Sequence, residues 1–259
     1  MSELVGTTIE GFYQSKPIRT FSGVTKAKCD DPEFRAGHFL GQEVSVNVEL
    51  VTHPNTSGRI IVNVPGALGD IDGYAEKYKK LAHYIQSAEL ASVVRTGNDF
   101  LAGFLPDLSL RTALEYAKTH AWEICGKYDP EILLMGFSAG ASAIAADAHE
   151  YPQVTSILLY APSGDMPDQM IQNGLQEFNG NVCIVIGEND DVVGPQAGKT
   201  FYDLATGAQH RELIYVPSCD HQFRGEANGR IMSEAPFYAF AMDDRPKFPD
   251  PTGGIKLYD

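Results

Sequence analysis

Ser138 stands in the motif G-F-S-A-G at positions 136–140, a G-x-S-x-G pattern typical of a serine held on a sharp turn. An apolar run over 131–135 leads into the motif, and a run of small residues over 141–146 follows it. This context predicts a turn from a buried strand into a helix, so that the hydroxyl projects beside a helix N-terminus. The free N–H groups there favour developing negative charge. The chemistry that such a serine can do is nucleophilic attack on a carbonyl group.

A serine hydroxyl needs a general base, and an imidazole that titrates near neutrality is suited to this task. His221 is the best candidate of the seven histidines, because it follows the last predicted strand, over 212–216, and therefore lies at the carboxyl edge of the sheet. The other histidines fall in early loops, on helices or at a strand start: His38, His53, His83, His120, His149 and His210.

The imidazole in turn needs a carboxylate that holds one tautomer. Asp190 is the first choice, because it follows the predicted strand over 181–186 and because the chain order serine, aspartate, histidine fits the required geometry. Asp191, its neighbour, is a competitor, since adjacent loop residues point in different directions. Asp165, one strand earlier, is a weaker one.

The predicted strands come from runs of apolar residues without alternation, as expected for strands covered on both faces: 59–64, 90–94, 131–135, 155–160, 181–186 and 212–216. Residues 42–50 instead alternate strictly between apolar and polar, which predicts a half-buried strand near a sheet edge. Helical patterns lie between the strands. The expected caps or first-turn residues are Asp72 for a helix over 74–85, Ser109 for one over 110–124, and Pro195 for one over 196–205.

This alternation predicts an α/β fold with a parallel sheet, and chemistry is then expected at the carboxyl ends of the strands. An oxyanion hole would combine the N–H of Ala139 with one from the loop over 64–70, where Ala67 is the first choice and Leu68 the second. Three further polar residues follow the strand over 90–94 and are candidates for the pocket: Arg95, Asn98 and Asp99.

Together, the G-F-S-A-G motif, the segment 187–190 and the segment 220–223, in that order and each after a strand, resemble the α/β-hydrolase superfamily over about residues 40–240. One departure is Pro65-Gly66, where many members carry His-Gly. The lipase-type run His-Gly-Gly-Gly is absent, which argues against the hormone-sensitive-lipase branch.

The residues and the resemblance imply one α/β-hydrolase domain over 1–259, acting on a small-molecule ester without cofactor or metal. Ser138 would attack the carbonyl, His221 would transfer the proton, Asp190 would orient His221, and the N–H groups of Ala67 and Ala139 would hold the oxyanion. A carboxylesterase of class EC 3.1.1 is the expected activity. Thioesterase, peptidase or lyase action is the alternative within this fold, and a non-catalytic ligand-binding protein is the alternative outside enzymes.

Members of this fold often carry a cap between the strands expected here over 155–160 and 181–186. The interval 161–180 allows at most one or two short helices. We therefore expect a minimal cap, an open pocket and a preference for short acyl groups.

The composition excludes other classes of function. Twenty Lys and Arg against 34 Asp and Glu give a formal net charge of −14, which opposes binding to nucleic acid or to an anionic membrane. No apolar run is long enough to span a bilayer and no signal peptide is visible, so a soluble, cytoplasmic protein is expected. The four cysteines form no C-x-x-C pair; Cys125, Cys183 and Cys219 have apolar neighbours and are expected to be core thiols.

The two ends of the chain carry weaker patterns. Residues 1–40 contain short strand-like pieces that would either extend the sheet or pair subunits in a homo-oligomer. Residues 243–259 are rich in Pro, Gly and charge, which predicts an irregular tail.

Overall fold

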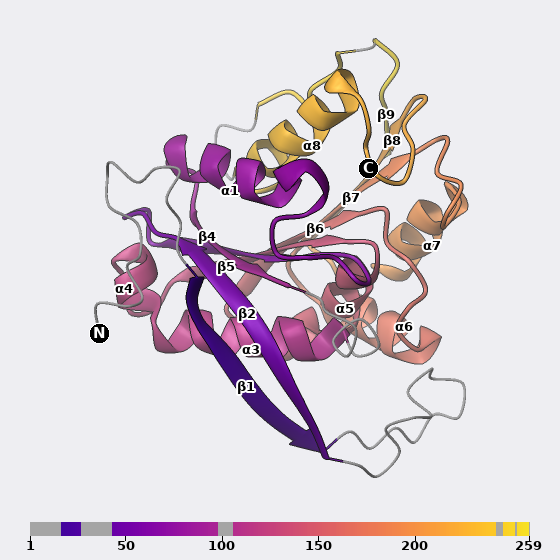
Figure 1. The fold of residues 1–259 in the computed structure, drawn as a ribbon. Helices are drawn as coiled ribbons and strands as arrows, with labels where there is room; N and C mark the ends of the chain where they lie inside the picture. The colour runs from indigo at the N-terminus through magenta and orange to yellow at the C-terminus, as the bar shows by residue number, and fades with distance from the viewer. Residues whose placement is uncertain (1–16, 27–42, 98–105, 242–245, 252, 259) are drawn as a thin grey trace.

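The computed structural model describes residues 17–26, 43–97, 106–241, 246–251 and 253–258. The strands in these ranges are β1 (Pro17–Lys26), β2 (Glu43–His53), β3 (Arg59–Val64), β4 (Ser92–Thr96), β5 (Glu131–Phe137), β6 (Val154–Tyr160), β7 (Asn181–Gly187), β8 (His210–Val216) and β9 (Lys256–Tyr258). They form one sheet with the order β1-β2-β4-β3-β5-β6-β7-β8-β9. The strands from β4 to β8 in this order are parallel, while β1, β2 and β9 pair antiparallel (Figure 1).

Helices cover both faces of this sheet. The helical elements are η3 (Tyr74–Glu76), α1 (Lys77–Ser87), α3 (Pro106–Thr119), α4 (Ala121–Cys125), α5 (Ala139–Asp147), η4 (Ala148–Glu150), α6 (Asp168–Glu177), α7 (Gln196–Leu204) and α8 (Glu226–Ala239). Helices α1 and α8 lie on one face, and α3 to α7 lie on the other (Figure 1).

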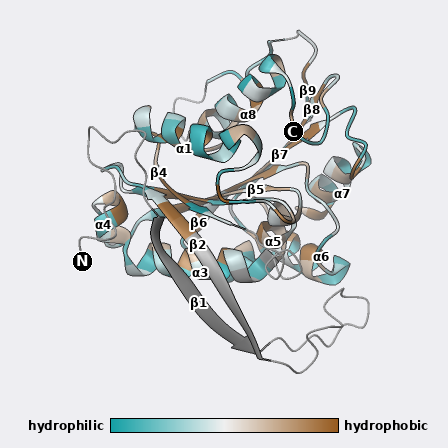
Figure 2. Cartoon of the chain, viewed as in Figure 1, coloured by the Kyte–Doolittle hydropathy of each residue, from teal (hydrophilic) through white to brown (hydrophobic). Residues whose placement is uncertain are grey.

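Successive residues of a central strand enter different hydrophobic cores. In β3, Ile60, Val62 and Val64 pack with α3, α5 and α6, whereas Ile61 packs with α1 and α8. Hydrophobic residues therefore gather in the sheet, and hydrophilic residues lie on the helices that cover it (Figure 2). Burial on both faces explains why these strands have no polar alternation. The predicted α/β class is confirmed.

The order of the strands produces a crevice at the carboxyl edge of the sheet. The chain goes from β3 to β4 on one side, and β5 then pairs with β3 on the other side. Connections that diverge from neighbouring parallel strands leave a crevice at their carboxyl ends. The loop after β3 and Ser138 after β5 border this crevice.

Two predicted helix starts are wrong. Asp72 does not cap the first helix, because Ala75 and Glu76 have positive φ values of 52° and 60° and α1 begins only at Lys77. The Asp72 carboxylate instead pairs with Arg95 at 2.7 Å. Ser109 lies inside α3, which begins at Pro106, a residue suited to a first helical turn.

Other boundaries differ by less. The predicted helix over 110–124 is divided into α3 and α4, because His120 has a non-helical φ of −114°. The strand predicted over 90–94 is present as β4 but is displaced by two residues. Pro195 directly precedes α7, and the small residues after Ser138 form α5, as predicted.

The tail predicted as irregular over 243–259 contains β9, which pairs with β8, and Phe248, which is buried. A strand of three exposed residues has no apolar periodicity, so its sequence carries no strand pattern. At the other end β1 pairs with β2, so this segment extends the sheet. Within the described ranges, no helix is long and apolar enough to cross a membrane.

Candidate active site

Ser138 lies at the turn from β5 into α5, where its φ is 52° and its ψ is −116°. Its N–H donates to the Tyr160 carbonyl at 2.9 Å, which ties the turn to the end of β6. Such a conformation is strained for a residue with a side chain, and it persists only where the surrounding structure enforces it. Here the buried strand before Ser138 and the buried helix after it supply that constraint.

The two glycines of the motif make this turn sterically possible. A Cβ on Gly136 would lie 2.7 Å from the backbone N and Cα of Ala141. A Cβ on Gly140 would overlap the carbonyl oxygens of Val64 and Pro65. Helix α5 can therefore pack directly against the end of β3, which brings Ser138 next to the loop after β3.

Replacing Gly140 with Ala tests this packing. We expect the Gly140→Ala variant to lose about 1–3 kcal/mol of unfolding free energy, because the new methyl group meets backbone atoms that cannot rotate away. Gly229→Ala is the matched control, since Gly229 is also helical and a Cβ there meets nothing within 4 Å. It should gain up to about 1 kcal/mol from helix propensity. Urea unfolding of both variants decides; equal stabilities would contradict the close approach.

The structure brings Ser138, His221 and Asp190 into one hydrogen-bonded chain. His221 Nδ1 lies 2.8 Å from Asp190 Oδ2, and His221 Nε2 lies 3.1 Å from Ser138 Oγ. A carboxylate can only accept, so Nδ1–H donates to Asp190, and the Nε2 of the neutral ring accepts from the Ser138 hydroxyl. The side chains of His221 and Asp190 are 7% and 0% exposed, so the bond between them is shielded from water.

Backbone groups orient the Asp190 carboxylate. Its Oδ1 accepts from the N–H groups of Val192 and Val193, each at 3.0 Å, which leaves Oδ2 facing His221. The loops after β7 and β8 are also joined to each other, since the Asn189 N–H donates to the Cys219 carbonyl at 3.0 Å. The two side chains are therefore held by one connected pair of loops.

The other two aspartates lie elsewhere. Asp191 is exposed, in the same loop as Asp190. Asp165 accepts from the Ser163 hydroxyl at 2.5 Å and lies beside Ser138 on the side of β6. Of the three candidates, Asp190 is the one whose carboxylate bonds His221.

The loop after β3 lies against the serine, as the oxyanion-hole prediction requires. A Cβ on Gly66 would lie 3.1 Å from Ser138 Cβ, and Ala67 and Leu68 line a cavity together with Ser138 and His221. The backbone of Gly66 is already hydrogen-bonded to the hydroxyl of Tyr78, whose pKa is raised by burial. Ala67 therefore stays the preferred donor of this loop. Ala139 is the first residue of α5, so its N–H has no acceptor within that helix.

Arg95, a predicted candidate for the pocket, lines neither of the two cavities described below. It lies in β4 with a side chain 2% exposed, and three polar contacts satisfy its buried guanidinium group. It donates to His53 Nε2 at 2.9 Å, to the Ile71 carbonyl at 2.5 Å and to Asp72 Oδ1 at 2.7 Å. Burial, and then the charge of Arg95, lower the pKa of His53 and keep it neutral. Asn98 and Asp99 lie outside the described residues.

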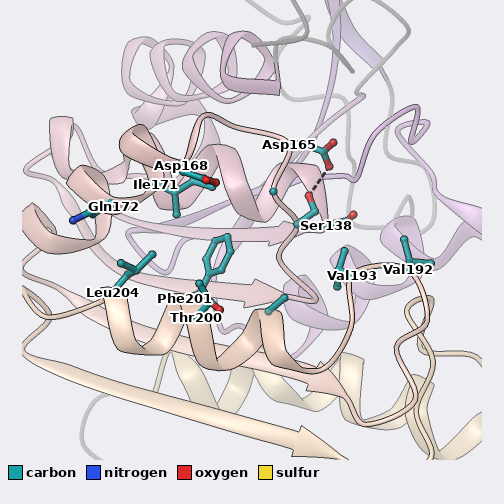
Figure 3. Close-up of a pocket in the computed structure, with 13 residues that line it drawn as sticks. Ser138, Asp165, Asp168, Ile171, Gln172, Val192, Val193, Thr200, Phe201 and Leu204 are labelled. Atoms are coloured by element: carbon teal, nitrogen blue, oxygen red, sulfur yellow. Dashed lines mark hydrogen bonds between the residues drawn. The ribbon is translucent and has the colours of Figure 1, made fainter. Parts of the chain in front are cut away.

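Two cavities meet at Ser138. The larger, about 730 Å³, lies between α6 and α7 (Figure 3). The smaller, about 550 Å³, lies between the loop after β3, the start of α1 and His221. Ser138, Asp165 and Val192 line both cavities and therefore mark their junction.

The sequence does not identify Tyr78 and Phe201 as residues that line these cavities. Tyr78 and Phe201 fall within the helices predicted over 74–85 and 196–205, and a helix prediction does not separate a pocket wall from a core. The position of Asp165 in the sequence could have indicated a place in the cavity wall, because this residue follows the carboxyl end of β6 by five residues.

The described ranges contain three of the four cysteines. Cys125, Cys183 and Cys219 are buried thiols, as predicted, and burial raises the pKa of Cys219 to about 12, so this thiol stays protonated. Cys29 lies outside these ranges. Among the described residues, no group of three or more His, Cys, Asp or Glu is arranged to hold a metal ion.

Comparisons by sequence and by structure differ in outcome. No family model and no curated protein matches the sequence. Solved structures do match. An esterase from Pyrococcus furiosus has a TM-score of 0.57 and 12% identity, covering 92% of this chain and 98% of that one. A dienelactone hydrolase from Anabaena variabilis has a TM-score of 0.57 and 14% identity, covering 84% and 94%.

A third similar structure is an α/β serine hydrolase homologue from Coxiella burnetii, with a TM-score of 0.54 and 18% identity, covering 84% of this chain and 94% of that one. Identities this low show a shared fold and no more. The resemblance expected from the sequence is confirmed at that level: the chain has the α/β-hydrolase fold.

Proposed function

We propose that the chain is a serine hydrolase that cleaves carboxylic esters through an acyl-enzyme on Ser138. The single observation that carries the proposal is the hydrogen-bonded chain from Asp190 through His221 to Ser138, with the serine on a strained strand-to-helix turn typical of a nucleophile elbow. Three structural neighbours named as esterase, dienelactone hydrolase and serine hydrolase homologue support hydrolysis on this fold.

The geometry accounts for each step. His221 Nε2 takes the proton from Ser138 Oγ as this oxygen attacks the carbonyl carbon, and the buried Asp190 carboxylate stabilises the imidazolium. The N–H groups of Ala67 and Ala139 stabilise the oxyanion. His221 then gives its proton to the leaving alkoxide, the acyl-enzyme remains, and a water molecule activated by His221 releases the acid.

A substrate panel in which the same acyl group is joined through an ester, a thioester or an anilide linkage tests this proposal. We expect an acyl ester to be hydrolysed faster than the corresponding thioester or anilide. Faster thioester or anilide cleavage would reassign the same machinery to a thioesterase or a peptidase. No turnover of any member would favour a ligand-binding protein.

The length of the acyl chain, varied within a series of esters, gives a second test. Between β6 and β7 the only described helix is α6, of ten residues, and the larger cavity is open and partly lined by polar side chains such as Gln172 and Thr200. A buried CH₂ contributes about 0.8 kcal/mol, but a chain that stays in water gains none of this. We therefore expect p-nitrophenyl esters of C2 to C6 acids to have higher kcat/KM than those of C12 or longer. An optimum at long chains would show that a lid forms over the site.

A further inference from the structure

The position of His221 relates the two cavities to the two parts of an ester. His221 lines the smaller cavity and is not among the described residues that line the larger one. In the mechanism above, its Nε2 must lie near the oxygen of the leaving alcohol, because it donates a proton to this oxygen. Ala67, the preferred oxyanion donor of its loop, lines the smaller cavity too. On this mechanism the alcohol part of the substrate lies in the smaller cavity, and the acyl part, bound to Ser138, extends into the larger one.

Three exposed side chains line the smaller cavity and form what we call the exposed rim: Leu68, Tyr74 and Val192. Leu68 and Tyr74 belong to the segment between β3 and α1, whereas Val192 follows β7 and lies at the end of the larger cavity away from Leu204 (Figure 3). Single exposed apolar residues are normal on a protein surface, but several around one cavity indicate a place that a ligand covers.

Three charged side chains also line the smaller cavity, and each has a partner within the protein. Asp70 Oδ1 accepts from two backbone N–H groups, and Asp165 Oδ2 accepts from the Ser163 hydroxyl at 2.5 Å. Lys77 Nζ lies 3.3 Å from Gln222 Oε1. The uncharged rim is therefore the part of this cavity that a substrate can cover without displacing a contact of the protein.

Tyr74 is carried by a strained and anchored turn. Ala75 and Glu76, which follow it, have φ values of 52° and 60°. The Glu76 N–H donates to the Gly73 carbonyl at 2.9 Å, and the buried guanidinium of Arg95 holds the two residues that precede this turn. Strain of this kind persists only where the surrounding structure enforces it, and it gathers at ligand-binding and catalytic sites. The backbone thus fixes the place from which the Tyr74 side chain projects.

The ring of Tyr74 is available to a ligand. Its side chain is 77% exposed and, within the part of the chain that the structure describes, it makes no hydrogen bond, ion pair or ring contact. A tyrosine ring prefers to pair with another aromatic ring, offset or edge to face, and such a pair contributes more than the area it buries. The hydroxyl at the tip of the ring can meanwhile stay in water. An aromatic group on the alcohol part of the substrate has the matching chemistry.

We propose that Tyr74 is a specificity-determining residue that selects esters of alcohols carrying an aromatic ring, with this ring packed on Tyr74 in the smaller cavity. The proposal rests on the esterase function above. Leu68 and Val192 favour any apolar alcohol, because they have no ring, and the preference for an aromatic one therefore depends on Tyr74.

Two pairs of esters, each differing only in whether the ring is aromatic or saturated, test the proposal. Benzyl acetate and cyclohexylmethyl acetate carry the ring on the alcohol, whereas ethyl phenylacetate and ethyl cyclohexylacetate carry it on the acyl group. All are assayed below their solubility limits. We expect the wild-type kcat/KM of benzyl acetate to exceed that of cyclohexylmethyl acetate about fivefold, a factor typical of one contact between aromatic rings. Both acetates form the same acetyl-enzyme, so this difference reports contacts of the alcohol.

Tyr74→Ser should lower the ratio of benzyl acetate to cyclohexylmethyl acetate about fivefold relative to the wild type. The intrinsic reactivities of the two esters cancel in this comparison. The ratio within the ethyl ester pair should not change, because the acyl group lies in the other cavity. Tyr74→Phe should keep the wild-type ratios, since the ring remains. Tyr128→Ser is the matched control and should keep them too, because Tyr128 is 80% exposed and lines neither cavity.

Equal ratios in the wild type and Tyr74→Ser, with the esters cleaved, would overturn the role of Tyr74 and leave the esterase function standing. An equal loss in Tyr128→Ser would also overturn that role. A loss in the ethyl ester pair instead would overturn the assignment of the alcohol to the smaller cavity. A preference found only above the solubility limit would overturn the proposal in favour of binding to an apolar surface. No hydrolysis of any ester would overturn both this proposal and the esterase function.

Discussion

Asp190→Asn should lower kcat by about four orders of magnitude with folding intact, as loss of the correct histidine tautomer does in comparable triads. The loop explains why the loss should be this complete. Asp190 Oδ1 accepts from the N–H groups of Val192 and Val193, and the Asn oxygen will keep these bonds. The Asn amide N–H₂ then faces His221 Nδ1, which must become the acceptor. Nε2 consequently carries the proton and cannot take one from Ser138.

The controls are the two other aspartates that the sequence allowed. Asp191→Asn should leave kcat for a neutral ester within about twofold, because Asp191 is exposed and His221 bonds Asp190. Asp165→Asn should lower kcat for that ester far less than Asp190→Asn does. A crippled Asp165→Asn beside an active Asp190→Asn would move the acid to the loop after β6.

Ser138→Ala should lower kcat by about 10⁵- to 10⁶-fold, because the hydroxyl that would form the acyl-enzyme is gone. The residues should also behave as one unit, so that the double variant with Asp190→Asn is no slower than Ser138→Ala alone. Ser142→Ala is the matched control: this serine is one turn away and bonds the backbone carbonyls of Ser138 and Ser163. It should lose less than about tenfold, with both variants checked for native circular dichroism. Activity that survives in Ser138→Ala would contradict covalent catalysis at this residue.

The candidate site could be predicted from the sequence as far as the ends of the strands determine it. Ser138, Asp190 and His221 each follow a buried apolar run, and parallel strands bring such positions to one edge of the sheet. The choice between Asp190 and Asp191 depended on backbone donors within the loop, and no periodicity reports these.

What the sequence missed depends on contacts between distant residues. Asp72 looks like a helix cap until Arg95, from a neighbouring strand, takes its carboxylate. Strand β9 forms because β8 offers an unpaired edge, and its three residues carry no pattern of their own. The cavity between α6 and α7 is a property of how two helices pack, so Phe201 could only be assigned to a helix.

A fluorophosphonate probe followed by peptide mapping tests the central claim most directly, since it requires a serine that has a base and an oxyanion hole together. We predict one fast adduct on Ser138 in the folded protein, slowed strongly by Asp190→Asn and unchanged by Asp191→Asn. An adduct on any other serine, or none on a sample shown to be folded, would contradict catalysis by Ser138.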